Sequence, residues 1–333
     1  MIDQKHISIA RSAVEKASLV TRHVQQRLAS VRSMTKDDRS PVTIADFASQ
    51  AVVARELAQR LGGVRLVAEE SGGFLREPEH KVHLRATIDA LRESGAWPDA
   101  SEDAVLGAID RGAQEPDPGG TFWTLDPIDG TKGFLRSQQY CIALALIERG
   151  EVALGAMACP NLPRSSGAPI DALAPAAGAV GVVFHAVRGA GAFDPVRMAT
   201  RSPSVRPPVR VAESMEAAHS DHDAAARIMN RAAGAGGYKA VRLDSQCKYA
   251  VVARAQADVY LRLPVKPGYI ERIWDHAAGS LIALESGCTV TDISGKPLDF
   301  AHGHGLEANQ GVVVAPPDLH ARVIAAIAEL RPA

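Results

Sequence analysis

Residues 122–131 of the chain read FWTLDPIDGT. The first four residues have the pattern of a short strand, and the proline and Asp-Gly pair that follow predict a tight turn at its end. Asp126 and Asp129, three residues apart on such a turn, can direct their carboxylates into one small volume. Thr131 suits the start of a helix, whose free N–H groups and positive dipole end attract phosphate. A capped turn without function has the same composition, so this stretch alone leaves both interpretations open.

Four further carboxylates fall where helices and strands are expected to begin or end. Glu69 and Glu70 come directly after a short apolar run that predicts a strand. Asp46 falls in the first turn of a predicted helix, and Asp275 takes the N-cap position of another. Taken singly, a solvated surface pair, an acid favoured by the helix dipole and an ordinary cap explain these residues.

Taken together, these carboxylates predict a metal site. The set comprises Asp46, Glu69, Glu70, Asp126, Asp129 and Asp275. Five or six carboxylates that converge without a counter-ion would repel each other strongly. Hard oxygen ligands with no Cys or His nearby select Mg²⁺ or Mn²⁺ rather than zinc. Two such ions about 3.5–4 Å apart can hold the attacking and leaving oxygens of a phosphoryl transfer.

Around these motifs, helices and strands alternate as in an α/β protein. Helices are predicted over residues 5–32, 43–61, 224–233, 245–255, 275–286 and 317–330. Strands are predicted over residues 64–68, 122–125, 140–147, 151–159, 181–188, 191–193, 209–212, 257–263 and 311–315. Residues 71–118 are predicted to be a mixture of helix and loop. A stretch rich in Pro, Ala, Gly and Ser predicts a boundary between residues 1–162, with the metal-binding motifs, and residues 163–333, with substrate-binding residues and Asp275.

Composition excludes several classes of protein. The 333 residues carry a formal net charge of −1, so no bulk positive charge would hold the chain on nucleic acid or an anionic membrane. No apolar run reaches the ~18–20 residues of a membrane span, and the N-terminus lacks the apolar region of a signal peptide. The four cysteines lie far apart without a CxxC pair, which argues against a zinc site or a disulfide scaffold. We therefore expect a cytoplasmic monomer or homodimer whose partner is a small molecule.

The acidic motifs resemble a known family. Asp46, Glu69-Glu70, residues 126–131 (DPIDGT) and residues 274–279 (WDHAAG) are similar in order and spacing to the lithium-sensitive, magnesium-dependent phosphatases related to inositol monophosphatase. The branch that the chain resembles most is the 3′(2′),5′-bisphosphate nucleotidases. That likeness rests on residues 40–43 (SPVT), 132–136 (KGFLR), 159–162 (CPNL), 186–193 (AVRGAGAF), 243–249 (LDSQCKY) and 258–264 (DVYLRLP). One departure is Ala68, which stands where many relatives have glycine.

The resemblance implies a layered αβαβα fold of the inositol monophosphatase and fructose-1,6-bisphosphatase type, with the active site where its two halves meet. It also implies two or three Mg²⁺ ions, with Mn²⁺ as a substitute. The expected ligands are Glu69, Glu70, Asp126, Asp129, Asp275 and the backbone carbonyl of Ile128.

Other residues have expected roles in catalysis and substrate binding by the same resemblance. Asp46, with the Thr131 hydroxyl, would take the proton of the attacking water, and the N–H groups of Gly130 and Thr131 would hold the phosphate. The residues expected around the nucleotide are His219, Ser245, Lys248 and Arg262. Within an apolar strand Arg262 needs a partner, whereas a lysine on a helix is more often solvated. His219 lies in a polar run in which the matching position can shift to His222.

The implied reaction is hydrolysis of the 3′-phosphate of 3′-phosphoadenosine 5′-phosphate (PAP) to AMP, with the sulfated nucleotide PAPS, hydrolysed to APS, as a second substrate. The alternative is an inositol mono- or polyphosphate 1-phosphatase, which shares the metal motifs. Ser245, Lys248 and Arg262 favour the nucleotide because they suit a second phosphate and need not serve inositol. A third hypothesis is an inactive nucleotide-binding sensor, against which the complete set of acids argues.

Overall fold

The computed structural model of the protein describes residues 2–31, 40–168, 170, 181–194, 196–198, 200–202, 205–215, 222–264, 266 and 268–330. The helices in these ranges are α1 (Gln4–Val31), α2 (Ser40–Leu61), α3 (Gly73–Arg76), α4 (Lys81–Glu93), α5 (Glu102–Asp110), α6 (Thr131–Leu135), α7 (His222–Ala233), α8 (Cys247–Ala253), α9 (Ala277–Glu285) and α10 (Pro317–Leu330). The short 3₁₀ helices are η1 (Pro78–His80), η3 (Gly234–Gly236) and η4 (Ile273–Asp275).

The strands form two sheets. A seven-stranded sheet has the order β1 (Leu66–Ala68), β2 (Thr121–Asp129), β3 (Cys141–Glu148), β4 (Glu151–Cys159), β5 (Val182–Val187), β6 (Gly191–Asp194) and β7 (Val196–Arg197). A five-stranded sheet has the order β11 (Thr289–Thr291), β12 (Val312–Ala315), β10 (Val259–Arg262), β8 (Val209–Glu213) and β9 (Tyr238–Arg242).

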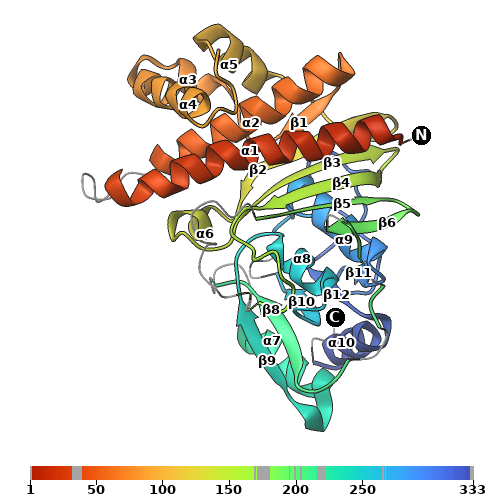
Figure 1. Ribbon diagram of the computed structural model, residues 1–333. Helices are drawn as coiled ribbons and strands as arrows, with labels where there is room; N and C mark the ends of the chain where they lie inside the picture. Colours follow the sequence, from red (N-terminus) through yellow and green to blue (C-terminus); the bar gives the residue numbers. More distant parts are fainter. Residues whose placement is uncertain are drawn as a thin grey trace.

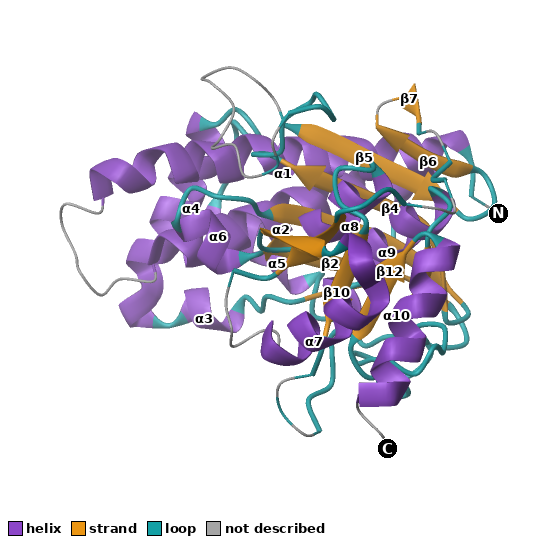
Figure 2. Cartoon of the chain, turned by 90° about the horizontal axis from the view of Figure 1, so that it is seen from below, coloured by secondary structure: helices purple, strands orange, loops and turns teal. Residues whose placement is uncertain are grey.

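The elements stack in five layers, as the αβαβα expectation required (Figure 1). Helices α1 and α2 pack on one face of the seven-stranded sheet, and α8 and α9 lie between that sheet and the five-stranded one. Helices α7 and α10 cover the far face of the five-stranded sheet, as the view from below shows (Figure 2). One buried core lies under α1 and α2, a second surrounds α8 and α9, and a third lies under α7 and α10.

Because several strands are parallel, the candidate site residues that follow them lie close together. Strands β1 and β2 are parallel, and the pairing of Ala68 with Leu125 sets Glu69 beside Asp126. In the other sheet, β8, β9 and β10 are parallel. Their carboxyl ends therefore meet at one edge, where ligands of α/β proteins bind.

Three local predictions were wrong. Strand β2 does not end at Leu125 but continues to Asp129, because its pairing with β3 resumes after a bulge that accommodates Pro127, which has no N–H to donate. Helix α2 begins at Ser40, which places Asp46 in its second turn rather than its first. Asp275 lies in η4, and the N-cap of α9 is His276 instead.

The sequence also missed several elements. Edge strands β9 and β11 were not predicted. Residues 71–118 are a mixture of helix and loop, as predicted, and their helices are α3, α4 and α5. The seven-stranded sheet continues through β5, β6 and β7, which lie beyond residue 162, and the division of the chain there stays a prediction.

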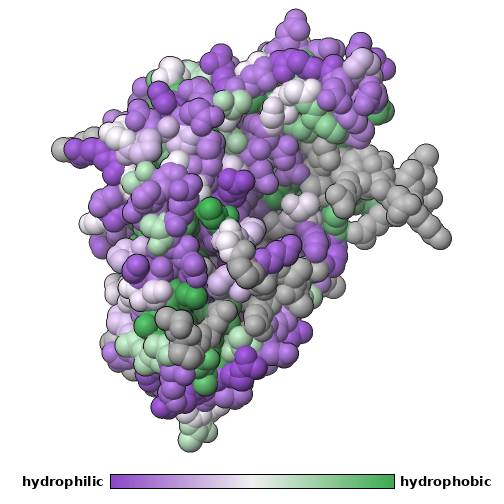
Figure 3. All heavy atoms as spheres, turned by 180° about the vertical axis from the view of Figure 1, so that it is seen from behind, coloured by the Kyte–Doolittle hydropathy of each residue, from purple (hydrophilic) through white to green (hydrophobic). Residues whose placement is uncertain are grey.

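The outer surface offers no sign of membrane insertion by a helix. Within the described ranges, no helix combines the length and apolar character that crossing a membrane needs. Seen from behind, the surface is mostly hydrophilic, with apolar residues in small scattered groups (Figure 3). The four cysteines are buried, and none is in a disulfide.

Candidate active site

A cavity of about 700 Å³ lies where the ends of β1 and β2 face the five-stranded sheet. Its lining contains every predicted site residue except His219: Asp46, Glu69, Glu70, Asp126, Ile128, Asp129, Gly130, Thr131, Ser245, Lys248, Arg262 and Asp275. It also contains residues to which the sequence analysis gave no role in the site: Lys132, Leu135, Ser214, Asp244, Gln246, Tyr260 and Tyr269. The fold therefore gathers in one cavity residues that are up to 229 positions apart, from Asp46 to Asp275.

His219 lies outside the described residues. The alternative position, His222, begins α7, and its Nε2 lies 3.1 Å from the carbonyl oxygen of Ser214. Because Ser214 lines the cavity, His222 contacts the cavity wall rather than the cavity itself.

Helix α2 holds both acidic segments in place. Gln50, one turn after Asp46, donates from Nε2 to the carbonyl oxygen of Glu70 at 2.7 Å and accepts the Glu70 N–H at 3.0 Å. Ser49 donates to the carbonyl oxygen of Pro127 at 2.8 Å. One helix thus carries Asp46 and fixes the backbone beside the other acids. The signal available in the sequence was two adjacent polar residues, Ser49 and Gln50, within a mainly apolar stretch. Both are fully buried in the structure, and buried polar groups need partners.

Gln246 connects Asp129 to the segment that carries Asp275. Its backbone N–H donates to Asp129 Oδ2 at 2.5 Å. Its side chain donates to the carbonyl oxygen of Trp274 at 2.8 Å and accepts the N–H of Gly279 at 3.1 Å. These three bonds fix two of the expected metal ligands relative to each other.

The turn before α6 is held against the loop that follows β9. Gly130 has a φ of 89°, and a Cβ there would lie 2.8 Å from the Cβ of Ser245, so the close approach requires glycine. Arg136 and Asp244 form an ion pair between the same two segments. The turn expected to bind phosphate and the loop expected to bind the nucleotide are therefore joined across the cavity.

Burial and mutual repulsion act on the carboxylates. The pKa of Asp46 and the pKa of Asp126 are raised well above their usual range, because burial penalises the charged form and neighbouring acids repel. The same causes raise the pKa of Glu69 and of Asp275 to about 7. Burial also raises the pKa of Asp129, although Lys248 opposes the shift. A bound cation would remove this repulsion.

The residues fit a hard divalent cation. Asp126 Oδ1 is buried and finds no hydrogen-bond partner among the described residues. The surrounding donors are carboxylate and carbonyl oxygens, which Mg²⁺ prefers. An orphaned buried oxygen within an all-oxygen donor set is the environment that such an ion completes.

Besides the exposed Lys132, two cations line the same cavity. Lys248 is 3% exposed, which contradicts the expectation of a solvated helix lysine. Its Nζ lies 3.4 Å from the carbonyl oxygen of Leu243 and 5.3 Å from the ring centroid of Tyr260, and burial lowers its pKa. Arg262 has the partner it was expected to need, since it donates to Glu271.

Glu271 belongs to a buried chain of contacts that the sequence did not reveal. Its Oε2 lies 3.3 Å from His276 Nε2, and His276 Nδ1 lies 2.8 Å from the Tyr249 hydroxyl. Because a carboxylate can only accept, Nε2 carries the proton and Nδ1 accepts from the tyrosine. The ligand atoms of Glu271, Asp275 and His276 lie within 4.8 Å of one another, but Glu271 is already engaged by Arg262.

Comparison with known proteins identifies the family and agrees with the fold. The model of the inositol monophosphatase family matches residues 3–331. The 3′(2′),5′-bisphosphate nucleotidase of Emericella nidulans is 42% identical over 347 residues, covering 96% of each chain. The 3′(2′),5′-bisphosphate nucleotidase 1 of Arabidopsis thaliana is 40% identical over 305 residues, covering 86% of this chain and 85% of the relative.

Among solved structures, inositol monophosphatase II of Staphylococcus aureus superposes with a TM-score of 0.59 at 17% identity, covering 96% of this chain and 93% of the other. At that identity the likeness concerns the fold alone. The family match and the two relatives extend over nearly the whole chain. The chain therefore belongs to the inositol monophosphatase family.

Proposed function

We propose that this protein is a Mg²⁺-dependent 3′(2′),5′-bisphosphate nucleotidase that hydrolyses the 3′-phosphate of PAP to AMP and phosphate, and PAPS to APS. The observation that carries the proposal is a single cavity lined by clustered carboxylates and by cations that include Lys248 and Arg262. The names of the two nucleotidase relatives support it.

The acids would hold two or three Mg²⁺ ions, or Mn²⁺ in their place. The proposed ligands are Glu69, Glu70, Asp126, Asp129, Asp275 and the carbonyl of Ile128. When bound, such ions supply positive charge for the phosphate and lower the pKa of water. In the proposed division, residues 1–162 supply most ligands, and residues 163–333 supply Asp275 and the nucleotide contacts.

The chain's own groups orient the reaction. Asp46, buried beside the other acids, accepts the proton of the attacking water, and the Thr131 hydroxyl orients that water. The N–H groups of Gly130 and Thr131, at the start of α6, hold oxygens of the transferred phosphate.

The second phosphate of the substrate would neutralise buried positive charge. Among the described residues, Lys248 has no hydrogen bond or ion pair with a carboxylate, so an anion in the cavity is the partner it lacks. The proposed site for the second phosphate also includes Arg262, Ser245 and, by resemblance, His219. A substrate with one phosphate leaves Lys248 unpaired, so binding of such a substrate is disfavoured.

The proposed setting follows from the cysteines and the charge. Four buried thiols, none of them in a disulfide, support a reducing compartment such as the cytoplasm. The partner is a small nucleotide, and the protein acts as a monomer or homodimer.

The test is phosphate release with Mg²⁺ from PAP, inositol 1-phosphate, inositol 1,4-bisphosphate and AMP, with APS formation from PAPS measured in parallel. Preference for PAP, abolished by EDTA, is expected. Preference for an inositol phosphate would keep the metal site but refute the proposed nucleotide contacts. No release from any compound, with binding of PAP retained, would instead favour the sensor hypothesis.

A further inference from the structure

A second hollow, of about 430 Å³, lies away from the active site and carries an excess of positive charge. Its charged lining residues are Arg201, Arg206, Arg210, Lys239 and Asp258. These are four cations and one carboxylate, which leave three positive charges unbalanced. We call it the basic hollow.

The basic hollow and the active site lie at opposite ends of the strands of the five-stranded sheet. Arg210 and Lys239 are the second residues of the parallel strands β8 and β9, and Asp258 directly precedes β10. The active site uses the other ends of the same strands, where Ser214 follows β8 and Arg262 ends β10. A ligand in the basic hollow would therefore not occupy the catalytic cavity.

Both oxygens of the single carboxylate in the basic hollow, that of Asp258, accept hydrogen bonds from arginine. Asp258 is 1% exposed. Its Oδ1 accepts from Arg201 at 3.1 Å and from Arg210 at 2.8 Å, and its Oδ2 accepts from the N–H and the Nε of Arg210, both at 2.9 Å. One carboxylate between two guanidinium groups leaves a net charge of one, held on side chains that the ion pairs keep in place.

Two further cations add to that charge. Lys239 is the register partner of Arg210 on the neighbouring strand, and Arg206 precedes the turn into β8. In the part of the chain that the structure describes, neither Arg206 nor Lys239 has an ion-pair partner. The positive charge is thus concentrated rather than spread among local pairs.

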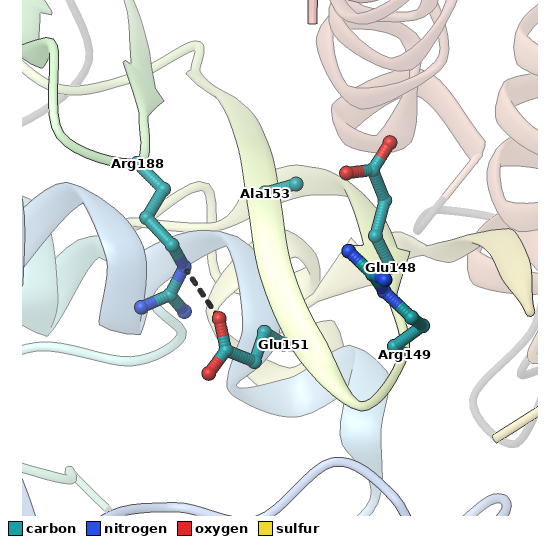
Figure 4. Close-up of a pocket in the computed structure, with 5 residues that line it drawn as sticks. All are labelled: Glu148, Arg149, Glu151, Ala153 and Arg188. Atoms are coloured by element: carbon teal, nitrogen blue, oxygen red, sulfur yellow. Dashed lines mark ion pairs between the residues drawn. The ribbon is translucent and has the colours of Figure 1, made fainter. Parts of the chain in front are cut away.

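Another surface hollow of the protein has no such excess of positive charge. At the turn between β3 and β4, Arg149 and Arg188 line a hollow together with Glu148 and Glu151, so its charges balance (Figure 4). There Arg188 Nε lies 3.7 Å from Glu151 Oε2. This neutral hollow provides a matched control.

We infer that the basic hollow binds a compact oxyanion of the phosphate class, either inorganic phosphate or the phosphate group of a nucleotide. Guanidinium groups present planar pairs of donors that match the oxygens of phosphate, and a lysine adds a point charge. A divalent anion would neutralise most of the unbalanced charge. This inference is independent of the reaction proposed for the active site.

The experiment is equilibrium dialysis of the full chain against radiolabelled inorganic phosphate, at low ionic strength and with EDTA. Without metal, the carboxylates of the active site weaken phosphate binding there, and any phosphate held beside Lys248 would persist in variants of the basic hollow. We expect one equivalent bound to the wild type and at least about tenfold weaker binding to the double variant Arg206→Glu/Lys239→Glu. The charge-conserving Arg206→Lys/Lys239→Arg variant and the control Arg149→Gln should bind as the wild type does.

Competition distinguishes the two sources of the anion. Displacement of phosphate by AMP would identify a site for phosphate esters, and displacement by sulfate but not AMP would identify a site for free anions; both outcomes support the inference. No binding by the wild type at millimolar phosphate, or equal binding by all variants, would overturn it. PAP turnover by Arg206→Glu/Lys239→Glu should stay unchanged, so failure here is distinguishable from failure of the proposed function.

Discussion

Arg262 and Glu271 form a two-point ion pair in the wall of the active-site cavity, with Nε to Oε1 and a terminal guanidinium nitrogen to Oε2 both at 2.7 Å. Burial alone would raise the pKa of Glu271, but hydrogen bonds from His276 and from Arg262 hold it at about 2. The carboxylate therefore stays charged, and it fixes the plane of the guanidinium that faces the cavity.

Replacing Glu271 with Gln should weaken binding of PAP. The amide keeps the shape but loses the charge that orients Arg262, and charge-assisted hydrogen bonds contribute ~1.5–3 kcal/mol. We expect KM to rise about ten- to a hundredfold, with a smaller change in kcat. Steady-state kinetics on PAP measure this, with Glu115→Gln, at an exposed carboxylate, as the control. An unchanged KM would show that Arg262 needs no support.

Lys248→Met should reduce the preference for bisphosphorylated substrates while the fold stays intact. Methionine matches the volume of the buried side chain and removes an ammonium that lacks a carboxylate partner, so stability should hold or rise. We expect kcat/KM for PAP to fall at least about tenfold, the effect of losing ~1.4 kcal/mol. If PAP and AMP are discriminated as well as before, Lys248 does not contact the second phosphate.

Asp129→Asn should stabilise the metal-free protein and abolish turnover. One less carboxylate in the buried cluster means less repulsion, whereas Mg²⁺ loses a ligand. Thermal unfolding with Mg²⁺ and with EDTA should show that Mg²⁺ raises Tm of the wild type but not of the variant. The exposed Asp89→Asn serves as the control. Turnover close to that of the wild type would refute the metal assignment.

Gly130→Ala should damage catalysis more than folding. The positive φ of 89° and the contact with Ser245 strain any side chain there, at a cost of about 1–2 kcal/mol. Because Gly130 begins the turn that we propose binds phosphate, we expect a loss in kcat/KM of about a hundredfold. Gly107→Ala is the matched control, since a Cβ at that position in α5 meets nothing within 4 Å. Equal activity of both variants would contradict the role of this turn.

His185 should make the protein less stable in acid. It is 6% exposed and stacked on Phe193, and burial, with a smaller contribution from Arg11, lowers its pKa from 6.5 to about 4. The unfolded chain therefore binds a proton between pH 6.5 and 4 that the folded chain refuses, so stability falls as pH falls through that window.

The contribution of His185 is at most about 3 kcal/mol. Urea unfolding of the wild type and of His185→Phe between pH 7 and 4 isolates it, because the phenyl ring keeps the stacking without titrating. The free energy of unfolding of the wild type, relative to that of His185→Phe, should fall as the pH falls. Parallel pH profiles would contradict a depressed histidine pKa.

Short-range features made much of the fold predictable. Strand patterns and helix periodicity located most strands and helices, because the alternation of buried residues is local. The errors came where a partner distant in the sequence decides the secondary structure. Strand β2 continues past Pro127 because β3 pairs with it. The edge strands β9 and β11 have little alternation of apolar and polar residues of their own.

The sequence by itself determined which residues are candidates for the chemistry, since the spacing within DPIDGT and WDHAAG and the position of Glu69-Glu70 after a strand are properties of single segments. Only the tertiary structure decided that they share a cavity, that Lys248 is buried in its wall, and that Gln50, Gln246 and Glu271 hold them in place. The physical reason is that a buried polar side chain depends on partners that packing supplies, and those partners lie up to 117 residues away along the chain.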